Sequence, residues 1–440
     1  MSTRRNFIKQ SALTASGAIF FQSVFSSPLF SCDEGDKRGK SPRNILLRSG
    51  WQVENIGDIA HTPAMLALIE KYIPNASVTF WPYYHVLPEN EVAMLKKRFP
   101  NLKIVEGKLD AQGKATTTAL QEAIANADFM LHNSGPATIG WADLNIFKKV
   151  FKKPFGVYGV TYGLYGTPEK EILSDAEFVY FRDSVSLQKA KDAGIHAPVM
   201  GFTPDAVFSI DVTDDEKATQ FLSANNLAVE KFMCCIPKHR STPMWLHKNK
   251  NRPFDAVRNA RNEEMKEHDH IPLRNAIIEV VRKTKMKILI CHEDETEMQI
   301  GKEWLLDKLP EDVKPNIVWR NTPWLTDEAI SIYKHSAGLF GAEMHSPIMC
   351  IAHGIPAIVV RWEEQSSKGI MWNDIGLSDW LFDFDKEEEI KRFVPTVLAM
   401  AMDTKQSKAK AGKAKKYAQE LQRKSMKVVE KTSRSLRKNA

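Results

Sequence analysis

Two side chains of this sequence have the type and position to act on an anionic substrate, Arg182 and His345. Arg182 follows the apolar run 178–181, a predicted strand, and a guanidinium at a strand end can clamp a carboxylate or a phosphate. A buried structural ion pair is the alternative interpretation of Arg182. His345 lies between a predicted strand and a predicted helix, where the helix dipole favours a neutral ring that can do acid–base chemistry.

Other polar segments follow predicted strands and carry weaker signals. Residues 54–58 contain Asn and Gly, which tolerate positive φ, and Asp58, which can cap the next helix. Capping alone would explain this segment. The turn 133–135 is polar and flexible enough to let a ligand approach the backbone, although a plain connecting turn explains it equally well.

The elements that must position these residues alternate between short apolar runs and helical patterns, which favours parallel sheets covered by helices. The first set of predicted strands covers 44–48, 77–81, 102–105, 129–132, 155–159, 178–181 and 198–201. The second set covers 232–237, 287–291, 316–318, 337–340 and 357–360. We therefore predict an α/β fold of two doubly wound Rossmann-like domains in tandem. This layout is similar to that of the two-domain (GT-B-like) glycosyltransferases, with the site in the cleft between the domains.

The same pattern predicts the domain boundaries: a signal peptide at 1–32, a tether at 33–43, an N-terminal domain at 44–228, a C-terminal domain at 229–403 and a basic helical tail at 404–440. The charged segment 239–272 is longer than a turn needs, and we interpret it as a lid or a substrate-contacting insertion. Its His268 and His270 are more typical of exposed residues than of metal ligands. We predict no metal and no cofactor.

Charge and cysteine content narrow the class of protein. The formal net charge is +7, but 13 lysines and arginines against two glutamates between Lys405 and Lys438 give that segment +11 and leave the rest at −4. We interpret the segment as a solvated helix, with contact to anionic lipid or acidic polysaccharide as the alternative. Its near lack of aromatic side chains argues against nucleic acid. The cysteines at 234, 235, 291 and 350 lie in apolar runs, so we expect buried free thiols.

The N-terminus resembles bacterial export signals. The pair Arg4-Arg5, Phe7 and the apolar stretch 12–25 are similar to a twin-arginine translocation signal, with a basic amphipathic surface helix as the alternative. Residues 29–32 resemble a lipoprotein signal-peptidase box with Cys32 as the lipidated residue. We therefore expect export by the twin-arginine route to the periplasm or cell envelope, followed by lipid anchoring at the membrane or by simple cleavage.

Six motifs occur in a fixed order between 45 and 360: N-x-G-D at 55–58, D-x-x-x-x-x-S-G at 128–135, the segment 153–160, Phe-Arg-Asp-Ser at 181–184, Pro204-Asp205, and His345 followed by Gly354-Ile355-Pro356. In this order they resemble the polysaccharide pyruvyl transferase family. The resemblance implies transfer of a pyruvyl group from phosphoenolpyruvate to a sugar of a cell-surface glycan. Arg182 would hold the anionic end of the donor, and His345 would act as general acid or base. The residues that we expect to contact substrate are Asn55, Gly57, Asp58, Gly135, Asp205, Lys238, His292, Glu343 and Ser346.

Two features depart from that expectation. Members of the family usually carry a basic residue two positions before the histidine, where this chain has Glu343, and a carboxylate there would repel phosphoenolpyruvate. Phosphoenolpyruvate is also a cytoplasmic metabolite, whereas the N-terminus predicts export. Two other hypotheses therefore stay open. One is a glycan-modifying transferase with a different donor, in which Glu343 pairs with His345 or binds sugar hydroxyls. The other is a non-catalytic glycan-binding protein in which Trp324, Trp362 or Trp372 stacks on sugars.

Overall fold

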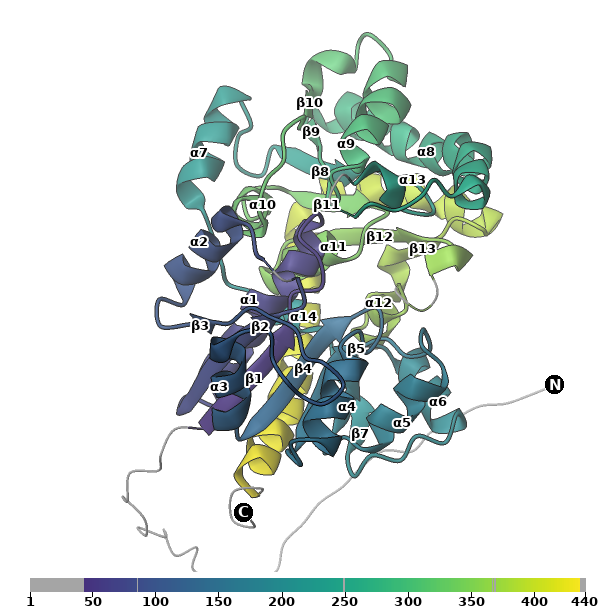
Figure 1. The fold of residues 1–440 in the computed structure, drawn as a ribbon. Coiled ribbons are helices and arrows are strands. Elements are labelled where there is room, and N and C mark those ends of the chain that lie inside the picture. Colours follow the sequence, from purple (N-terminus) through teal and green to yellow (C-terminus); the bar gives the residue numbers. More distant parts are fainter. Residues whose placement is uncertain (1–42, 85, 248–249, 366, 368, 436–440) are drawn as a thin grey trace, which may run out of the picture. The chain divides into compact units, whose positions relative to one another are not determined.

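A computed structural model of the chain describes residues 43–435, except 85, 248–249, 366 and 368. The predicted signal peptide, Cys32 and all of the predicted tether except its last residue lie outside the described residues. Two parallel sheets organise the described part (Figure 1). We call the part built on the first sheet the first half and the part built on the second sheet the second half.

The first sheet has seven parallel strands in the order β3-β2-β1-β4-β5-β6-β7. The chain moves outward from β1 to β3 and then crosses to β4, so the order reverses between β1 and β4, where ligands of such sheets usually bind. The strands are β1 (Arg43–Ser49), β2 (Ala76–Pro82), β3 (Lys103–Ile104), β4 (Phe129–Gly135), β5 (Phe155–Val160), β6 (Val179–Phe181) and β7 (Met200–Phe202).

Helices join these strands and cover both faces of the sheet. They are α1 (Ile56–Tyr72), α2 (Glu89–Arg98), α3 (Thr118–Asn126), α4 (Trp141–Lys149), α5 (Thr167–Ser174), α6 (Ser184–Asp192) and the short 3₁₀ turn η1 (Ala206–Ser209), and α7 (Asp215–Ala224) leads into the second half. Helix α1 is buried on all sides from Ile56 to Ile69 except at Asp58, because it also contacts α10, α11 and α14.

The second sheet has six parallel strands in the order β10-β9-β8-β11-β12-β13. The strands are β8 (Phe232–Ile236), β9 (Lys287–Ile290), β10 (Ile317–Trp319), β11 (Gly338–Gly341), β12 (Ala357–Arg361) and β13 (Leu381–Asp383). The two sheets confirm the predicted α/β fold of two doubly wound Rossmann-like domains. The edge strand β13 was not predicted, because three residues are too short to give a pattern.

The helices of the second half correct one prediction. They are α8 (Ala256–Thr284), α9 (Glu297–Ile300), α10 (Thr326–Tyr333), α11 (His345–Ala352), α12 (Met371–Asp374), α13 (Glu387–Met402) and α14 (Thr404–Ser435). The segment 239–272 is not a single loop, because its second part forms the start of α8, and its role as a lid or substrate-contacting insertion stays a prediction. Asp255 caps α8 by accepting from the backbone N–H of Arg258, and Pro272 lies inside the helix, where it hid the pattern.

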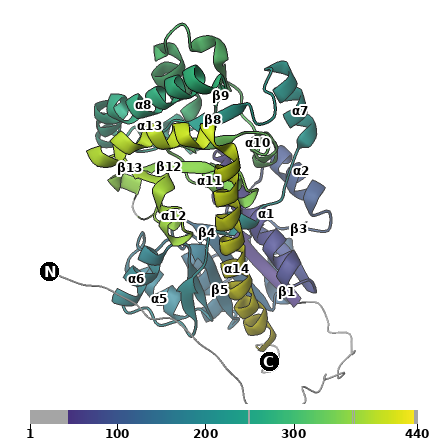
Figure 2. The same cartoon turned by 180° about the vertical axis from the view of Figure 1, so that it is seen from behind.

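The basic segment at the C-terminus is helical, as predicted, but it is not only a solvated tail. One face of α14 is buried through Ala411, Ala418, Met426 and other small or apolar residues. Helix α14 contacts α13 of the second half and runs back over α1 and η1 of the first half (Figure 2). It therefore ties the two halves together, and its lysines and arginines lie mainly on the outward face.

The cysteines at 234, 235, 291 and 350 are buried and free, which confirms the prediction from their apolar surroundings. Side chains of both sheets, such as Leu47 and Phe340, belong to one continuous hydrophobic core. The described residues form one compact unit by their contacts, and the predicted boundary at 228 stays a prediction. None of the described helices is long and apolar enough to cross a membrane.

Candidate functional site

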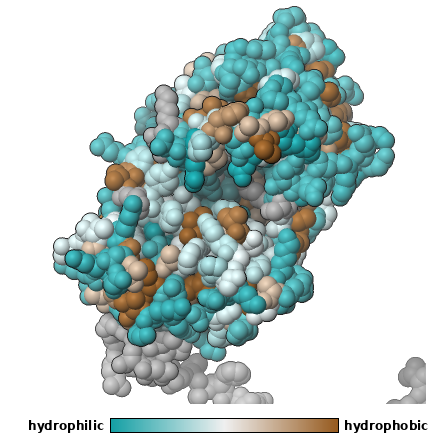
Figure 3. Space-filling model, turned by 45° about the vertical axis from the view of Figure 1, so that its right-hand side comes forward, coloured by the Kyte–Doolittle hydropathy of each residue, from teal (hydrophilic) through white to brown (hydrophobic). Residues whose placement is uncertain are grey.

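Polar side chains from both halves meet beside α1 and form what we call the central cluster: His61, Arg182, Asp205, Glu293 and His345. His61 lies on α1, and its Nε2 is 3.1 Å from Nε2 of His345, the first residue of α11. The same His61 Nε2 is 3.5 Å from Oδ2 of Asp205, which follows β7. All five side chains are buried, and the surface of the protein is hollowed between the two halves (Figure 3).

His345 and Glu293 form a histidine–carboxylate dyad. Nδ1 of His345 lies 3.1 Å from Oε1 of Glu293, and the backbone N–H of Ser346 donates to Oε2 of the same carboxylate at 2.6 Å. Because a carboxylate only accepts, Nδ1 of His345 carries a proton and Nε2 is left to exchange protons. The contact of 3.1 Å between the Nε2 atoms of His61 and His345 requires a proton between them. His61, His345 and Glu293 therefore form a continuous hydrogen-bonded chain.

The start of α1 brings the first half onto this dyad. Asn55 Oδ1 accepts from the backbone N–H groups of Gly57 and Asp58, so Asn55 caps the helix rather than Asp58 as predicted. The backbone N–H of Ile56 donates to the carbonyl oxygen of Glu293 at 2.9 Å. Gly57 allows this approach, because a Cβ at that position would overlap both the Glu293 carboxylate and the His345 side chain. The N-x-G-D motif thus has a packing role that its sequence alone did not reveal.

Replacing Gly57 by Ala is expected to lower the free energy of unfolding by about 1–3 kcal/mol, the usual cost of overpacking a tight contact. Gly412→Ala is the matched control, because this helical glycine has nothing within 4 Å of the added Cβ. The control should be neutral or slightly stabilising, since Ala is the better helix former. Urea unfolding of both variants measures the difference, and equal stabilities would show that α1 does not pack on the dyad as described.

Arg182 lies at the end of β6, as predicted, and forms a buried ion pair. Its Nη1 donates to Oδ2 of Asp205 at 3.1 Å and its Nε to Thr161 Oγ1 at 2.8 Å. Burial alone would raise the pKa of Asp205, but His61 and Arg182 lower it well below its usual value. The Arg182 side chain is therefore both a structural partner of Asp205 and a fixed cation within the central cluster. Asp183, the next residue, caps α6 by accepting from the backbone N–H of Ser186.

Gly135 ends β4 beside this cluster. Its φ of 129° is accessible to glycine at little cost, and Ser134 before it also has a positive φ of 39°. Ser134 Oγ donates to Oδ1 of Asp205 at 3.4 Å. The turn therefore connects β4 to the central cluster, next to the position where the strand order of the first sheet reverses.

Lys238 and Glu343, both predicted to contact substrate, form an ion pair with each other. Nζ of Lys238 forms a short ion pair with Glu343 and a second one at 3.2 Å with Glu297. Burial opposes the charge on Lys238, but the surrounding carboxylates of Glu343 and Glu297 raise its pKa above its usual value. The negative charge that Glu343 brings is thus balanced by a buried lysine at the end of β8. Glu343 thus pairs with Lys238, whereas Nδ1 of His345 lies against the carboxylate of Glu293.

His292 lies outside the central cluster. It follows β9 and packs against Trp324, with ring centroids 5.5 Å apart, at a separate pocket of 330 Å³ between the halves. The exposed fractions of Trp324, Trp362 and Trp372 are 6%, 1% and 0%, so these side chains pack in the core and the predicted stacking on sugars is wrong for the last two. Each of the three indole N–H groups donates to a backbone carbonyl.

One group among the described residues could hold a metal ion. Asp58, His61 and His345 each offer a ligand atom, and these atoms lie within 4.8 Å of one another. Two imidazoles and a carboxylate suit several divalent transition metals. His268 and His270 are instead engaged within the protein, with Asp269 and with the carbonyl oxygen of Lys266.

His61 and Glu293 belong to the central cluster but were not predicted from the sequence. His61 follows Asp58 by three residues on α1, a spacing that places both on one face of a helix and could have identified it. Glu293 is the third residue after β9, beyond the carboxyl end of a parallel strand, where site residues are expected. Both were passed over because each needs a partner from the other half or from α11.

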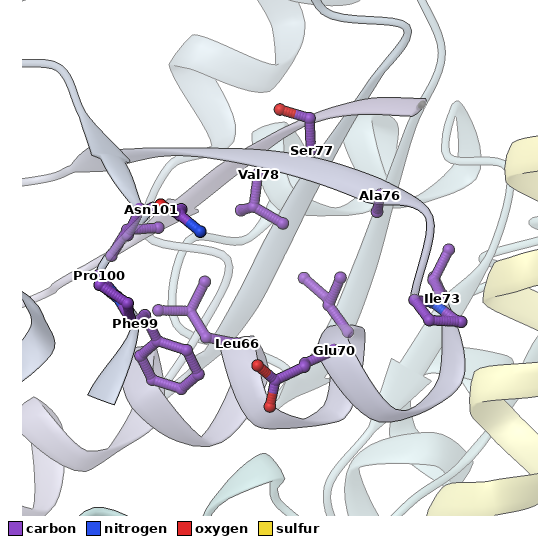
Figure 4. A pocket seen from close by; sticks show the side chains of 12 residues that line it. Leu66, Glu70, Ile73, Ala76, Ser77, Val78, Phe99, Pro100 and Asn101 are labelled. Carbon is purple, nitrogen blue, oxygen red and sulfur yellow. The ribbon is translucent and has the colours of Figure 1, made fainter. Parts of the chain in front are cut away.

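A further pocket lies away from the predicted residues. It has a volume of 440 Å³ and lies between the end of α1, β2 and the segment before β3, where Leu66, Ile73 and Val78 point into it (Figure 4). None of the residues predicted to contact substrate lines it. The site is therefore built from the central cluster rather than from this pocket.

Comparisons with known proteins agree with this architecture. The model of the polysaccharide pyruvyl transferase family matches residues 55–364. HepE of Anabaena in complex with UDP-glucose is similar in fold, with a TM-score of 0.53 and 10% sequence identity over 90% of this chain and 99% of that chain. MnaA of S. aureus in complex with UDP has a TM-score of 0.51 and 10% identity over 85% of this chain and 90% of that chain. The search of curated proteins finds no match.

Proposed function

Because the chain belongs to the polysaccharide pyruvyl transferase family, we propose that it transfers a pyruvyl group from phosphoenolpyruvate to hydroxyl groups of a glycan. The observation that carries this proposal is the His345–Glu293 dyad, which shares a proton with His61 beside the buried cation Arg182. Such a transfer needs an acid for the enol carbon and positive charge for the donor, and the central cluster offers both.

The chemistry follows from the structure of the donor. A proton from Nε2 of His345 adds to C3 of phosphoenolpyruvate, which becomes a methyl group, and C2 becomes electrophilic. One sugar hydroxyl attacks C2, a second hydroxyl replaces the phosphate, and the product is a cyclic ketal plus inorganic phosphate. Of the two hydroxyl protons, one replaces the proton that His345 gave and the other leaves with phosphate. Glu293 stabilises the protonated ring, and His61 holds the proton in reserve.

Arg182 is the cation that we propose to bind the carboxylate or phosphate of the donor. Its pair with Asp205 fixes the planar guanidinium, and a fixed guanidinium loses less conformational freedom when it binds an anion than a mobile one does. Asp205 is in turn held by Ser134 and by α14 through Gln422, which donates to its backbone oxygen. The position of this cation therefore depends on both halves.

A second candidate donor is favoured by one observation. Lys238 follows β8, Glu343 follows β11 and Glu297 opens α9. Because Lys238 pairs with both glutamates, the second half offers no excess of positive charge there. Structures of similar fold hold UDP or UDP-glucose, and hydroxyl groups of a nucleotide sugar can donate to carboxylates. Transfer from a nucleotide-linked donor to a glycan is the alternative activity. A binding protein without catalysis is the third hypothesis.

The place of action is also a proposal. We propose that the protein works in the periplasm or cell envelope after twin-arginine export, with Cys32 as a lipid anchor, on the N-terminal pattern alone. A glycan acceptor at the cell surface is consistent with that location. The donor must then reach the protein outside the cytoplasm, or transfer must precede export of the folded protein.

Thermal unfolding of the full chain with and without phosphoenolpyruvate tests the donor. At about 100 times Kd the ligand should add about 2.7 kcal/mol to stability. Arg182→Lys should reduce this gain, because lysine lacks the bidentate fork. Arg98→Lys is the matched control, since Arg98 pairs with Glu70 and Asp211 at the surface. No stabilisation by phosphoenolpyruvate, together with stabilisation by UDP-glucose, would replace the proposed donor by the second candidate.

A further inference from the structure

The pocket beside His292 has the size and the position of a second binding site. Its volume of 330 Å³ falls in the range of small-molecule pockets, roughly 300–1,000 Å³. Its walls come from both halves: α1 and α2 on one side, and the segments after β9 and β10 on the other. Helices α2, α7 and α10 lie along this side of the molecule (Figure 1).

Two buried side chains that line the pocket have unused hydrogen-bonding capacity. His292 is 1% exposed, and neither ring nitrogen has a partner in the part of the chain that the structure describes. Burial lowers its pKa to about 3, so the ring is neutral and offers one donor and one acceptor. Glu91 is 2% exposed, and within the same described part its Oε2 also has no partner. Burial raises its pKa to about 8, so its carboxyl group is mostly protonated at neutral pH.

Most charged residues of the lining already have partners. Glu54 accepts from the Tyr84 hydroxyl at 3.1 Å and forms an ion pair with Lys250 at 3.3 Å, and Glu328 forms one with Arg320 at 2.7 Å. An anionic ligand would meet the carboxylates of Glu54, Glu295 and Glu328, whereas Lys217, the one cation among the described residues of the lining, already pairs with Asp214 at 3.5 Å. The unused groups are uncharged, and each can both donate and accept. A ligand that matches them is uncharged and rich in hydroxyl groups.

The pocket also touches the dyad. Glu293 lines it, and the same carboxylate holds Nδ1 of His345. Trp324 fixes the segment that carries His292, because its indole N–H donates to the carbonyl oxygen of His292 at 3.0 Å. A ligand in the pocket would therefore lie on the Glu293 side of the dyad, while Arg182 lies on the His61 side. This leaves separate places for an anionic donor and a neutral acceptor.

We propose that this pocket binds an uncharged sugar residue of the acceptor glycan, with His292 and Glu91 as hydrogen-bonding partners of its hydroxyl groups. The proposal rests on the proposed function, because it takes the acceptor to be a glycan. It states where the acceptor binds and which groups of the protein recognise it. It excludes phosphate, nucleotides and acidic sugars from this pocket.

Saturation-transfer NMR of the full chain with three methyl glycosides, of galactose, glucose and mannose, tests the proposal without any donor. At least one glycoside should bind at millimolar concentration, and His292→Phe should weaken it by about tenfold or more, the effect of a lost hydrogen bond. Glu91→Leu should weaken it likewise. His353→Phe is the matched control, because His353 is also largely buried with a partnerless Nε2 among the described residues but does not line the pocket.

The outcomes separate this inference from the proposed function. Absence of binding by all three glycosides, binding that survives both His292→Phe and Glu91→Leu, or displacement of the glycoside by inorganic phosphate would each overturn the inference. Thermal unfolding of each variant identifies one that has failed to fold, and the other variant then decides. Stabilisation by phosphoenolpyruvate is measured independently. A chain that binds phosphoenolpyruvate but no glycoside loses only this inference, and one that binds glycoside but not phosphoenolpyruvate loses only the proposed donor.

Discussion

Replacing His345 by Gln is expected to lower the rate of pyruvyl transfer by a factor of about 10²–10⁴, the usual contribution of a general acid or base. Gln is chosen because its amide can still donate to Glu293, which keeps the buried carboxylate partnered, but it cannot deliver a proton. Release of phosphate from phosphoenolpyruvate, measured with a polysaccharide extract of the cell envelope as acceptor, gives the rate. Thermal stabilisation by phosphoenolpyruvate should persist, because Arg182 is unchanged.

Two further variants distinguish the role of His345 as an acid from the effects of neighbouring residues. Glu293→Gln should cause a smaller loss, and it should shift the pH at which the rate falls, because the carboxylate no longer stabilises the protonated ring. His353→Gln changes a half-buried histidine outside the site and should leave the rate as it is. A His345→Gln protein that keeps the wild-type rate would remove His345 from the mechanism. A wild-type protein that transfers nothing, but still binds glycan, would favour the binding hypothesis.

The sequence predicted most of the fold because the signals for parallel strands are local. Runs such as 232–236 are fully apolar, and turns with glycine or proline separate them from helices. The prediction of two elements failed for identifiable reasons. The first part of α8 is charged on most of its surface and contains Pro272. Neither its hydrophobic periodicity nor its helix propensity therefore indicates a helix. The sequence of α14 predicts a solvated tail, because its buried face consists largely of alanine and polar side chains such as Gln422.

The candidate site was harder to predict, because its contacts join residues that are far apart in the chain. Arg182 and His345 could be selected, since each stands alone at a strand end or a helix start. Their partners could not, because the pair His61–His345 spans 284 residues and Lys238–Glu343 spans 105. A polar residue at a strand end looks the same in sequence whether it faces substrate or another side chain. Lys238 and Glu343 were therefore predicted as separate substrate contacts, although they neutralise each other.

Replacing Lys238 by Met should lower the free energy of unfolding by about 3–5 kcal/mol, the cost of removing one partner of a buried ion pair. The change leaves the buried carboxylates of Glu343 and Glu297 without the lysine that they share. Methionine has a similar length, so the loss reports charge rather than a cavity. Urea unfolding measures it. Lys391→Met is the matched control, because Lys391 pairs with Glu388 at the exposed surface and such pairs contribute about 1 kcal/mol or less.

The double variant Lys238→Met, Glu343→Gln decides whether the two side chains act as a unit. If the lysine is needed mainly to balance Glu343, removing that charge as well should restore part of the stability, and the two effects will not be additive. Additive losses would mean that Lys238 is held chiefly by Glu297. The same double variant also tests the identity of the donor. It removes the Glu343 carboxylate, which disfavours phosphoenolpyruvate, together with the lysine that neutralises this carboxylate. If Lys238 neutralises Glu343 in the wild-type protein, the double variant should bind phosphoenolpyruvate with unchanged affinity. Lys238→Met alone should bind it more weakly, because the negative charge of Glu343 is then no longer neutralised.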